Sequence, residues 1–207
     1  MQIVDSPLAS QRKHTTWPTA VAALARKKSV VLITSDRAVL MFGAGTADTV
    51  QMATLIRYSS GFVQTALPEA VCDHLQLPEA TPDRRHSGAA ANGQCVAVDS
   101  AVGVTTGISA ADRARTARVL VNPLTSPEDL TRPGHMVPVR VTPQLAEAPN
   151  GVIPALALTL TMAACAIPGA VYADLVSPTN PIRMASSGEA IAFASAHNFI
   201  VFDATAL

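Results

Sequence analysis

Charged and aromatic side chains are scarce in this sequence. Of its 207 residues, 14% are charged and 4% are aromatic, and 15 basic side chains balance 15 acidic ones. A neutral chain has no general attraction for nucleic acid or for an anionic membrane surface, and so few aromatic rings offer little for stacking bases. We therefore expect no nucleic-acid partner and no membrane partner. A surface so poor in charge is more typical of one that a second subunit partly covers.

Cysteine is rare as well, and its spacing excludes two kinds of site. Cys72, Cys95 and Cys165 are odd in number, widely spaced and without a CxxC pair. A disulfide framework or a structural zinc site is therefore not expected. The first 28 residues contain no continuous apolar run of the kind found in signal peptides. We expect three reduced thiols in a cytoplasmic protein.

The most apolar stretch of the chain runs from residue 152 to residue 173. Its length approaches that of a membrane span, but Pro154 and Pro168 interrupt it. A buried helix over residues 153–165, followed by a strand over residues 171–175, is the better interpretation.

Hydrophobic patterns predict an irregular alternation of helices and strands. Two apolar runs at residues 29–34 and 38–42, separated by a short turn, predict a β-hairpin. Further strands are expected at residues 94–99, 137–141 and 199–202, and a loop at residues 144–150. Helical spacing predicts helices over residues 49–58, 110–119 and 187–197. This pattern favours an α+β fold with a mixed sheet in a three-layer α/β/α arrangement, in one domain spanning residues 1–207.

Three hydroxyl side chains surround a glycine just before the helix at residues 110–119. They are Thr105, Thr106 and Ser109, around Gly107. Hydroxyl and free N–H groups at the start of a helix can bind phosphate or another anion. The alternative is a plain helix cap, with Ser109 as the capping residue and Asp112 three positions further on.

His135 follows a Pro-Gly pair and precedes the strand expected at residues 137–141. A histidine on a glycine-hinged loop is a candidate acid or base near neutral pH. The alternative is a histidine that only hydrogen-bonds its loop.

Taken together, two segments resemble the 3,4-dihydroxy-2-butanone 4-phosphate synthase family of riboflavin biosynthesis. They read GVTTGISAADR (residues 103–113) and RPGHMVPVR (residues 132–140). Residues 57–61, 85–88 and 189–202 resemble further stretches of the family, so the resemblance covers residues 18–203. It implies the family's fold and a homodimer with active sites at the subunit interface. It assigns substrate contacts to Thr105, Thr106, Ser109, Asp112, Arg113, Asp36, Arg85 and His86.

The sequence departs from the family pattern where the resemblance places magnesium. The family's acidic loop has one carboxylate left here, Asp36, and residues 147–155 lack the His-Thr-Glu motif. A carboxylate on a later strand survives as Asp174. Because hard divalent cations need several oxygen ligands, a single acid is a poor magnesium site. We expect no metal and no other cofactor.

Three hypotheses about function follow. The first is a diverged enzyme that performs metal-independent acid/base chemistry on a small metabolite, as an isomerase, lyase or cyclase in a specialised pathway, with His135 and Asp174 as catalytic residues. The second is a non-catalytic binding or scaffold homologue. The third is an authentic 3,4-dihydroxy-2-butanone 4-phosphate synthase that acts on ribulose 5-phosphate. Substrate-loss assays separate the first two, and magnesium dependence separates the third.

Overall fold

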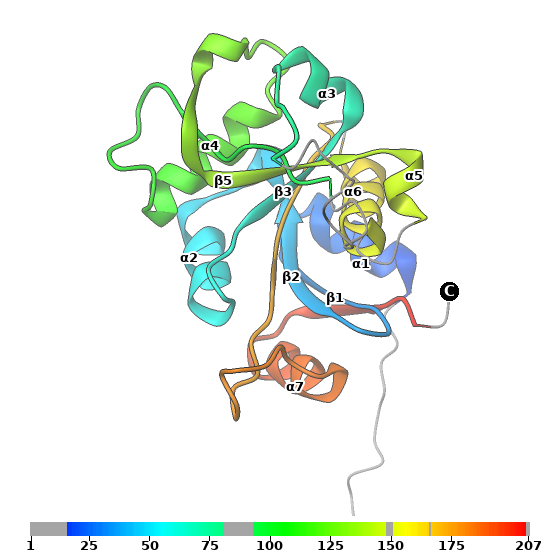
Figure 1. The fold of residues 1–207 in the computed structure, drawn as a ribbon. Coiled ribbons are helices and arrows are strands. Elements are labelled where there is room, and N and C mark those ends of the chain that lie inside the picture. The colour runs from blue at the N-terminus through cyan, green and yellow to red at the C-terminus, as the bar shows by residue number, and fades with distance from the viewer. Residues whose placement is uncertain (1–15, 81–92, 148–150, 166, 206–207) are drawn as a thin grey trace, which may run out of the picture.

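One mixed β-sheet organises the molecule. The computed structural model describes residues 16–80, 93–147, 151–165 and 167–205. Within them, seven strands form a sheet in the order β4-β5-β3-β6-β2-β1-β7 (Figure 1). The strands are β1 (Val30–Ile33), β2 (Ala38–Gly43), β3 (Gln64–Pro68), β4 (Val98–Ser100), β5 (Leu130–Val141), β6 (Ala170–Asp174) and β7 (Ile200–Asp203).

The strand directions are mixed, as predicted. β1 and β2 form the expected antiparallel hairpin, in which Val31 lies opposite Leu40. β2–β6, β3–β6 and β4–β5 are also antiparallel, whereas β1–β7 and β3–β5 are parallel. Parallel neighbours need a crossover connection, and the helices between the strands supply it.

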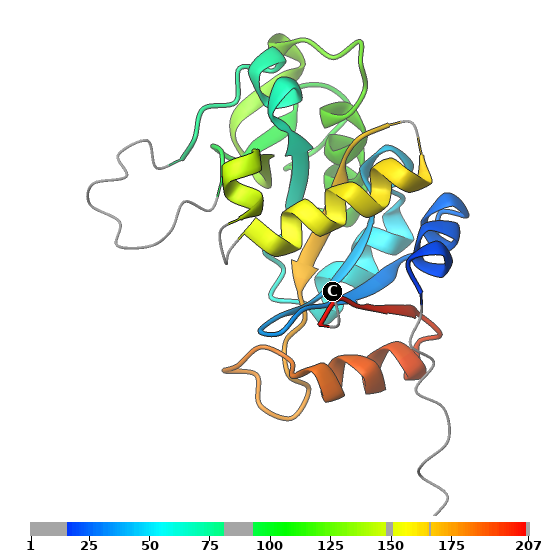
Figure 2. The ribbon, with the colours of Figure 1, turned by 90° about the vertical axis from the view of Figure 1, so that its right-hand side faces the viewer.

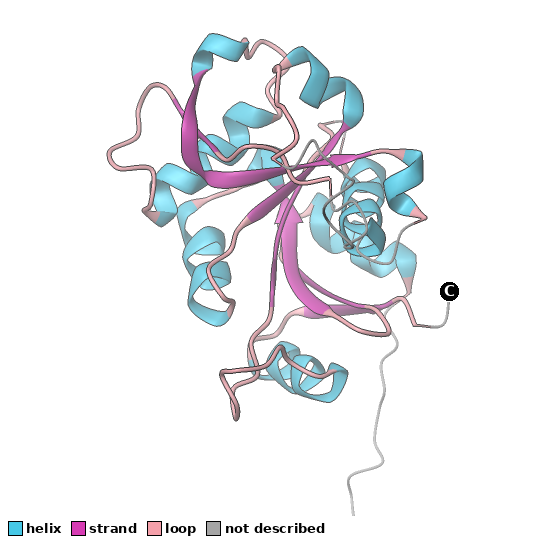
Figure 3. Cartoon of the chain, in the orientation of Figure 1, coloured by secondary structure: helices cyan, strands magenta, loops and turns pink. Residues whose placement is uncertain are grey.

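Helices cover both faces of the sheet. They are α1 (Trp17–Ala25), α2 (Thr49–Tyr58), α3 (Glu69–His74), α4 (Ala110–Leu120), α5 (Pro143–Ala146), α6 (Val152–Ala164) and α7 (Ser187–Ala196), with 3-10 turns η1 (Ala44–Thr46) and η2 (Pro127–Asp129). Figures 1 and 3 show α1 and α6 on one side of the strands and α2 and α4 on the other. In Figure 2, α6 runs across the front of the sheet.

Two hydrophobic cores follow from the alternation of side chains along each strand. Val31 and Leu40 pack with α2, α4 and α7 on one face, whereas Val30 and Met41 pack with α1 and α6 on the other. Successive residues of a strand point to opposite faces, so one apolar strand serves both cores. The predicted α+β fold with a three-layer arrangement is confirmed.

α6 is 13 residues long and nearly coincides with the helix expected at residues 153–165, ending one residue before Cys165. None of the helices in the described ranges is long and apolar enough to cross a membrane.

Two of the expected segments outside the site take a different form in the structure. Residues 144–150 were expected to form a loop, but α5 includes residues 144–146. Thr142 caps it by accepting a hydrogen bond from the Leu145 N–H (3.1 Å), and Pro143 occupies its first turn. The strand expected at residues 94–99 is reduced to β4, since Gln94 and Cys95 form only isolated bridges.

Candidate active site

Hydrogen bonds to the first turn of α4 order the polar loop at residues 105–109. The Ser109 hydroxyl accepts a hydrogen bond from the Asp112 N–H (3.0 Å) and so caps the helix. The Asp112 carboxylate accepts hydrogen bonds from the Thr105 hydroxyl (2.8 Å), the Thr105 N–H (3.2 Å) and the Gly107 N–H (3.2 Å). The hydrogen bond from the Thr105 hydroxyl, helped by these N–H groups, lowers the pKa of Asp112, although burial opposes it. The helix-cap interpretation is confirmed for Ser109.

Of the residues that the resemblance assigned to the substrate, some form these hydrogen bonds and others do not. Thr105, Ser109 and Asp112 use their polar groups on one another. Thr106 is exposed and forms no side-chain hydrogen bond with the described residues. The Thr106 hydroxyl therefore remains available to a ligand, as does the O–H of the exposed Ser109, whose oxygen only accepts.

Gly107 brings this loop into contact with a second pair of residues. Its φ of +80° lies in the left-handed region that favours glycine. A Cβ at this position would lie 2.0 Å from Asp99 Oδ2 and 2.7 Å from His135 Nδ1. The backbone of the loop therefore packs directly on Asp99 and His135.

Asp99 holds His135 at two points. Its Oδ1 accepts a hydrogen bond from the His135 backbone N–H (3.0 Å), and its Oδ2 lies 2.7 Å from His135 Nδ1. The Asp99 side chain is 9% exposed and the His135 side chain is 37% exposed. Because a carboxylate accepts hydrogen bonds, the contact requires a hydrogen on Nδ1, which leaves Nε2 as the nitrogen that can take a proton. This arrangement is an oriented acid/base group at the protein surface.

An irregularity in β5 creates this contact. Thr131 pairs with Asp99 and Met136 pairs with Val98, so the four residues between Thr131 and Met136 have no partner residue in β4. Such bulges redirect side chains. Gly134 is required here, because a Cβ would lie 2.0 Å from the Val98 carbonyl carbon. His135 therefore lies within β5, and the prediction that it precedes the strand is wrong.

Arg113 lies on α4 close to the same pair. Its Nη1 donates a hydrogen bond to the Gly61 carbonyl oxygen (2.9 Å), and its Nε is buried without a partner among the described residues. Burial lowers the pKa of Arg113, and the nearby charge of Asp99 opposes this effect.

Asp174 ends β6 and binds a residue of the β1–β2 turn. The Arg37 Nε and Nη2 donate to the two carboxylate oxygens of Asp174, at 2.9 and 2.7 Å. This two-point hydrogen bond raises the pKa of Arg37, against the effect of burial. Both Asp174 oxygens are thus engaged by one guanidinium group.

Asp174 and His135 lie at the same end of the sheet without touching. Gln64 of β3 lies opposite both Val137 of β5 and Tyr172 of β6. His135 and Asp174 are each two residues beyond this row, in the same direction. Two strand spacings, about 10 Å, separate their backbones.

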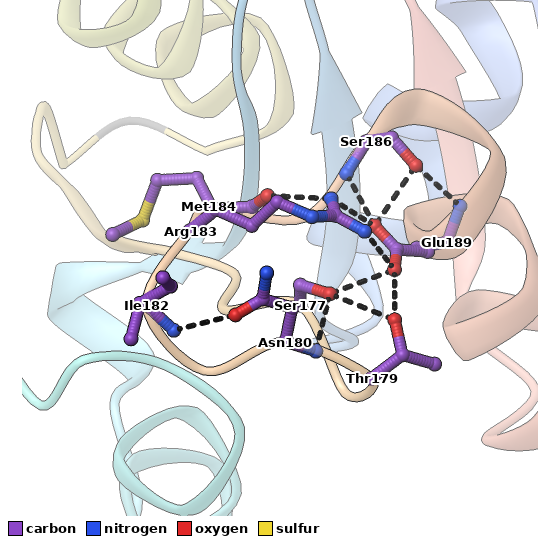
Figure 4. A network of polar contacts seen from close by, with 8 residues as sticks. All are labelled: Ser177, Thr179, Asn180, Ile182, Arg183, Met184, Ser186 and Glu189. Atoms are coloured by element: carbon purple, nitrogen blue, oxygen red, sulfur yellow. Dashed lines mark hydrogen bonds and ion pairs between the residues drawn. The ribbon is translucent and has the colours of Figure 1, made fainter.

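The chain that follows Asp174 is held by a single glutamate (Figure 4). The Glu189 carboxylate accepts hydrogen bonds from Ser177 and Thr179 (2.7 and 3.0 Å), from both terminal nitrogens of Arg183 (2.8 Å each), and from the Ser186 N–H and hydroxyl (2.9 Å each). One side chain of α7 therefore fixes the loop between β6 and α7.

Asp36 is the remaining predicted site residue that the structure describes, and it precedes Arg37 in the chain. Asp36 lies in the β1–β2 turn and accepts a hydrogen bond from the Thr34 hydroxyl (3.0 Å). Arg85 and His86 lie outside the described residues.

Two cavities lie among the described residues, and the wall of one includes Leu175, the residue after Asp174. One, of about 390 Å³, lies between α3 and the end of α4, and the other, of about 270 Å³, lies between α2 and α7. The first is lined mainly by apolar side chains. The second includes Arg57, Tyr58 and Glu189 in its wall.

Residues 18–207 match the family model described as 3,4-dihydroxy-2-butanone 4-phosphate synthase. The chain belongs to this family. A synthase of that name from Vibrio cholerae is 34% identical over 186 residues, covering 88% of this chain and 83% of the relative. The riboflavin biosynthesis protein RibBA of Rhodococcus jostii is 37% identical over 185 residues, covering 86% of this chain and 43% of the relative. The chain thus spans less than half the length of that RibBA protein.

A solved synthase of the family corrects the expectation about cofactors. It is 29% identical, has a TM-score of 0.77, covers 90% of this chain and 91% of its own, and is in complex with two magnesium ions. The expectation that no cofactor is involved is therefore wrong for the family to which this chain belongs. The physical error was to count carboxylates alone, since magnesium keeps several waters and often takes one or two carboxylates together with substrate oxygens.

A magnesium ion needs several oxygen ligands around one point. Among the described residues, no group of three His, Cys, Asp or Glu side chains could hold a metal. The guanidinium of Arg37 occupies the Asp174 carboxylate, and its charge repels a second cation. The described residues therefore do not fit a magnesium site built by the protein alone.

Asp99 and Arg37 are the site residues that the sequence did not reveal. A carboxylate at the end of an expected strand, just ahead of a hydroxyl-rich loop, was the available signal for Asp99. Arg37 had no local signal, because its partner Asp174 is 137 residues away in the chain.

Proposed function

We propose that this chain is an enzyme of the 3,4-dihydroxy-2-butanone 4-phosphate synthase type that acts on ribulose 5-phosphate in riboflavin biosynthesis. The observation that carries the proposal is the His135–Asp99 pair, in which a buried carboxylate orients an exposed imidazole. Family membership supports the choice of substrate, since relatives named for this reaction share most of the chain.

The pair suits the first step of such chemistry. Enolising a ketose phosphate requires removal of a proton from a carbon next to the carbonyl group, which is general-base work. In this proposal His135 takes that proton at Nε2, and Asp99 stabilises the imidazolium through Nδ1. Asp99 is therefore a positioning residue, and His135 is the catalytic one.

Two cationic or polar groups near the pair are assigned to substrate contact. Arg113 keeps its charge close to Asp99 and retains a donor without a partner among the described residues. Thr106, which precedes Gly107 in the chain, presents an exposed hydroxyl. We assign the substrate phosphate to these two residues, because cationic and hydroxyl donors are the usual ligands of phosphate oxygens. In this proposal Asp174 orients the Arg37 side chain toward the substrate.

A direct assay tests the proposal. Purified chain is mixed with ribulose 5-phosphate over a series of magnesium concentrations, and 3,4-dihydroxy-2-butanone 4-phosphate is followed by mass spectrometry. Product formation that disappears in His135→Asn supports the proposal. A folded chain that forms no product at any magnesium concentration contradicts it.

A second candidate is acid/base chemistry on a different small metabolite. The observation in its favour is the Arg37–Asp174 ion pair, because its guanidinium group occupies the carboxylate that the resemblance carries over to Asp174. Exchange of substrate C–H hydrogen for deuterium separates the two candidates. Exchange without product would show that the chain enolises ribulose 5-phosphate but does not complete the reaction. Absence of both exchange and product would favour another substrate.

A further inference from the structure

The cavity of about 270 Å³ between α2 and α7 has aromatic, apolar and polar side chains in one wall. Leu175 and Val176, which follow β6, and Ala185, which precedes α7, supply apolar surface. The Ala185 N–H donates a hydrogen bond to the Leu175 carbonyl oxygen (2.7 Å) and so joins the two ends of this loop. Cavities that hold drug-sized ligands measure about 300–1,000 Å³, so this one suits a smaller molecule with a single ring.

Two aromatic rings form part of the wall. Tyr58 ends α2 and Phe193 lies on α7, and both side chains are half-buried. Their ring centroids are 5.1 Å apart and their planes are inclined by 58°. Aromatic rings favour tilted and offset contacts with one another, so a flat ring placed here extends an existing pair. The wall therefore favours an aromatic ligand over an aliphatic one.

Arg57 brings a cation without a counter-ion to the same wall. Its guanidinium carbon lies 5.5 Å from the centre of the Tyr58 ring, a cation–π contact that keeps the charge beside the aromatic pair. Within the parts of the chain that the structure describes, Arg57 forms neither a hydrogen bond nor an ion pair. Its N–H groups are therefore available to an anion.

The other polar side chains of the wall favour an anion over a cation. The Glu189 carboxylate is engaged by hydrogen bonds from the β6–α7 loop, and Arg183 balances its charge (Figure 4). The Ser59 hydroxyl oxygen accepts a hydrogen bond from the Gly61 N–H (3.0 Å), and its own hydrogen has no acceptor among the described residues. The Ser59 O–H is therefore a second donor for an anion.

We propose that this cavity binds a small aromatic carboxylate, with its ring against Tyr58 and Phe193 and its carboxylate group on Arg57 and Ser59. A guanidinium group binds a carboxylate through two parallel hydrogen bonds, and a hydroxyl group adds a third donor. The cavity wall includes neither His135 nor Asp99, so the proposal does not depend on the proposed enzymatic function.

Three small probes test the ligand class on the full chain. 4-Fluorobenzoate, followed by fluorine NMR, is expected to bind with a dissociation constant of about 1 mM or lower, as is usual for a ligand of about ten heavy atoms. Cyclohexanecarboxylate has the same charge without the aromatic ring and should bind several-fold more weakly. Benzylamine has the ring with the opposite charge and should not bind measurably, because Arg57 repels it.

Variants of Arg57 test the location. Arg57→Gln is expected to weaken 4-fluorobenzoate binding about tenfold, as for loss of a charge-assisted hydrogen bond, and Arg57→Lys should weaken it less. Arg26→Gln is the matched control, since Arg26 is also exposed at the C-terminal end of a helix, α1, and is not part of the cavity wall. In the wild type, the ligand should shift the backbone amide NMR signals of Ser177 and Ala185, which line the cavity.

Three outcomes would overturn the proposal. They are the absence of binding at concentrations well above the expected dissociation constant, equal affinity in Arg57→Gln and Arg26→Gln, and equal binding of 4-fluorobenzoate and benzylamine. Amide shifts confined to residues outside the cavity would place the ligand elsewhere and overturn it as well. Because Arg57 is exposed, its replacement should leave the fold intact, and thermal melts of each variant check this.

Discussion

At the scale of single residues, the site depends on one carboxylate that orients one imidazole. Asp99 is nearly buried and bonds His135 through both the backbone N–H and Nδ1. A buried carboxylate in this position fixes the tautomer and the direction of the ring, as in other acid/base pairs.

Asp99→Asn is expected to lower kcat on the order of a hundredfold, because the amide no longer stabilises the protonated ring. KM should stay nearly unchanged, and the double variant with His135→Asn should be no worse than His135→Asn alone. Steady-state kinetics of the three variants provide the measurement. Asp48→Asn is the matched control, since Asp48 caps α2 and asparagine caps equally well. Additive losses in the double variant would argue against a coupled pair.

Comparing Gly107→Ala with Gly61→Ala distinguishes the cost of backbone strain from the cost of a clash with Asp99. Gly61 and Gly107 both have positive φ, but a Cβ at Gly61 meets nothing within 4 Å, whereas at Gly107 it meets Asp99. We expect Gly61→Ala to cost about 1 kcal/mol of unfolding free energy. Gly107→Ala should cost about 1–3 kcal/mol more and abolish turnover. Urea denaturation measures both, and equal losses would mean that the loop does not pack on Asp99 as described.

At the scale of elements, the helices were predicted better than the sheet edges. The helix expected at residues 49–58 coincides with α2, because its apolar spacing and capping aspartate are local features. β5 begins at Leu130, seven residues before the expected strand. Its extra length depends on pairing with β4 through a bulge, and local sequence does not encode that partner.

The loop between β6 and α7 is an element whose order rests on Glu189. Its bonds, first to Arg183 and then to Ser186 and Ser177, lower the pKa of Glu189 below the ordinary glutamate value. A carboxyl whose pKa is depressed by folding stabilises the fold above its unfolded pKa, about 4.3. That stabilisation declines as the pH falls below this value toward the folded pKa.

Glu189→Gln should therefore lower the melting temperature at pH 7 and speed proteolysis within residues 176–185. The difference from wild type should shrink as the pH is lowered below about 4, because the wild-type carboxyl then becomes protonated. Thermal melts across pH and limited proteolysis give the two measurements. Glu128→Gln, an exposed residue of η2, is the control. A melting difference that does not change with pH would point to lost packing rather than lost charge.

At the scale of the whole molecule, the chain exposes several large apolar side chains. Val50, Leu124 and Ile182 are 75%, 88% and 90% exposed. These side chains and the low proportion of charged residues are the features on which the expectation of a second copy rests.

We propose a homodimer as the solution state. Sedimentation equilibrium should give a mass near twice 21.4 kDa over a wide concentration range, since burying exposed apolar side chains favours the pair. A mass of 21.4 kDa throughout that range would exclude the dimer. Leu124→Ser and Ile182→Ser test separately whether either exposed side chain lies in the interface.

The sequence by itself determined the family, the α+β class, the β1–β2 hairpin and the cap of α4 by Ser109. These depend on spacing within short stretches, where hydrogen bonds and apolar periodicity are local. Only the tertiary structure placed Asp99 on His135 and Arg37 on Asp174. Each of these pairs joins segments that are distant in the chain, because strand order and a bulge in β5 determine which side chains meet. A pattern read along one segment carries no information about its partner across the sheet.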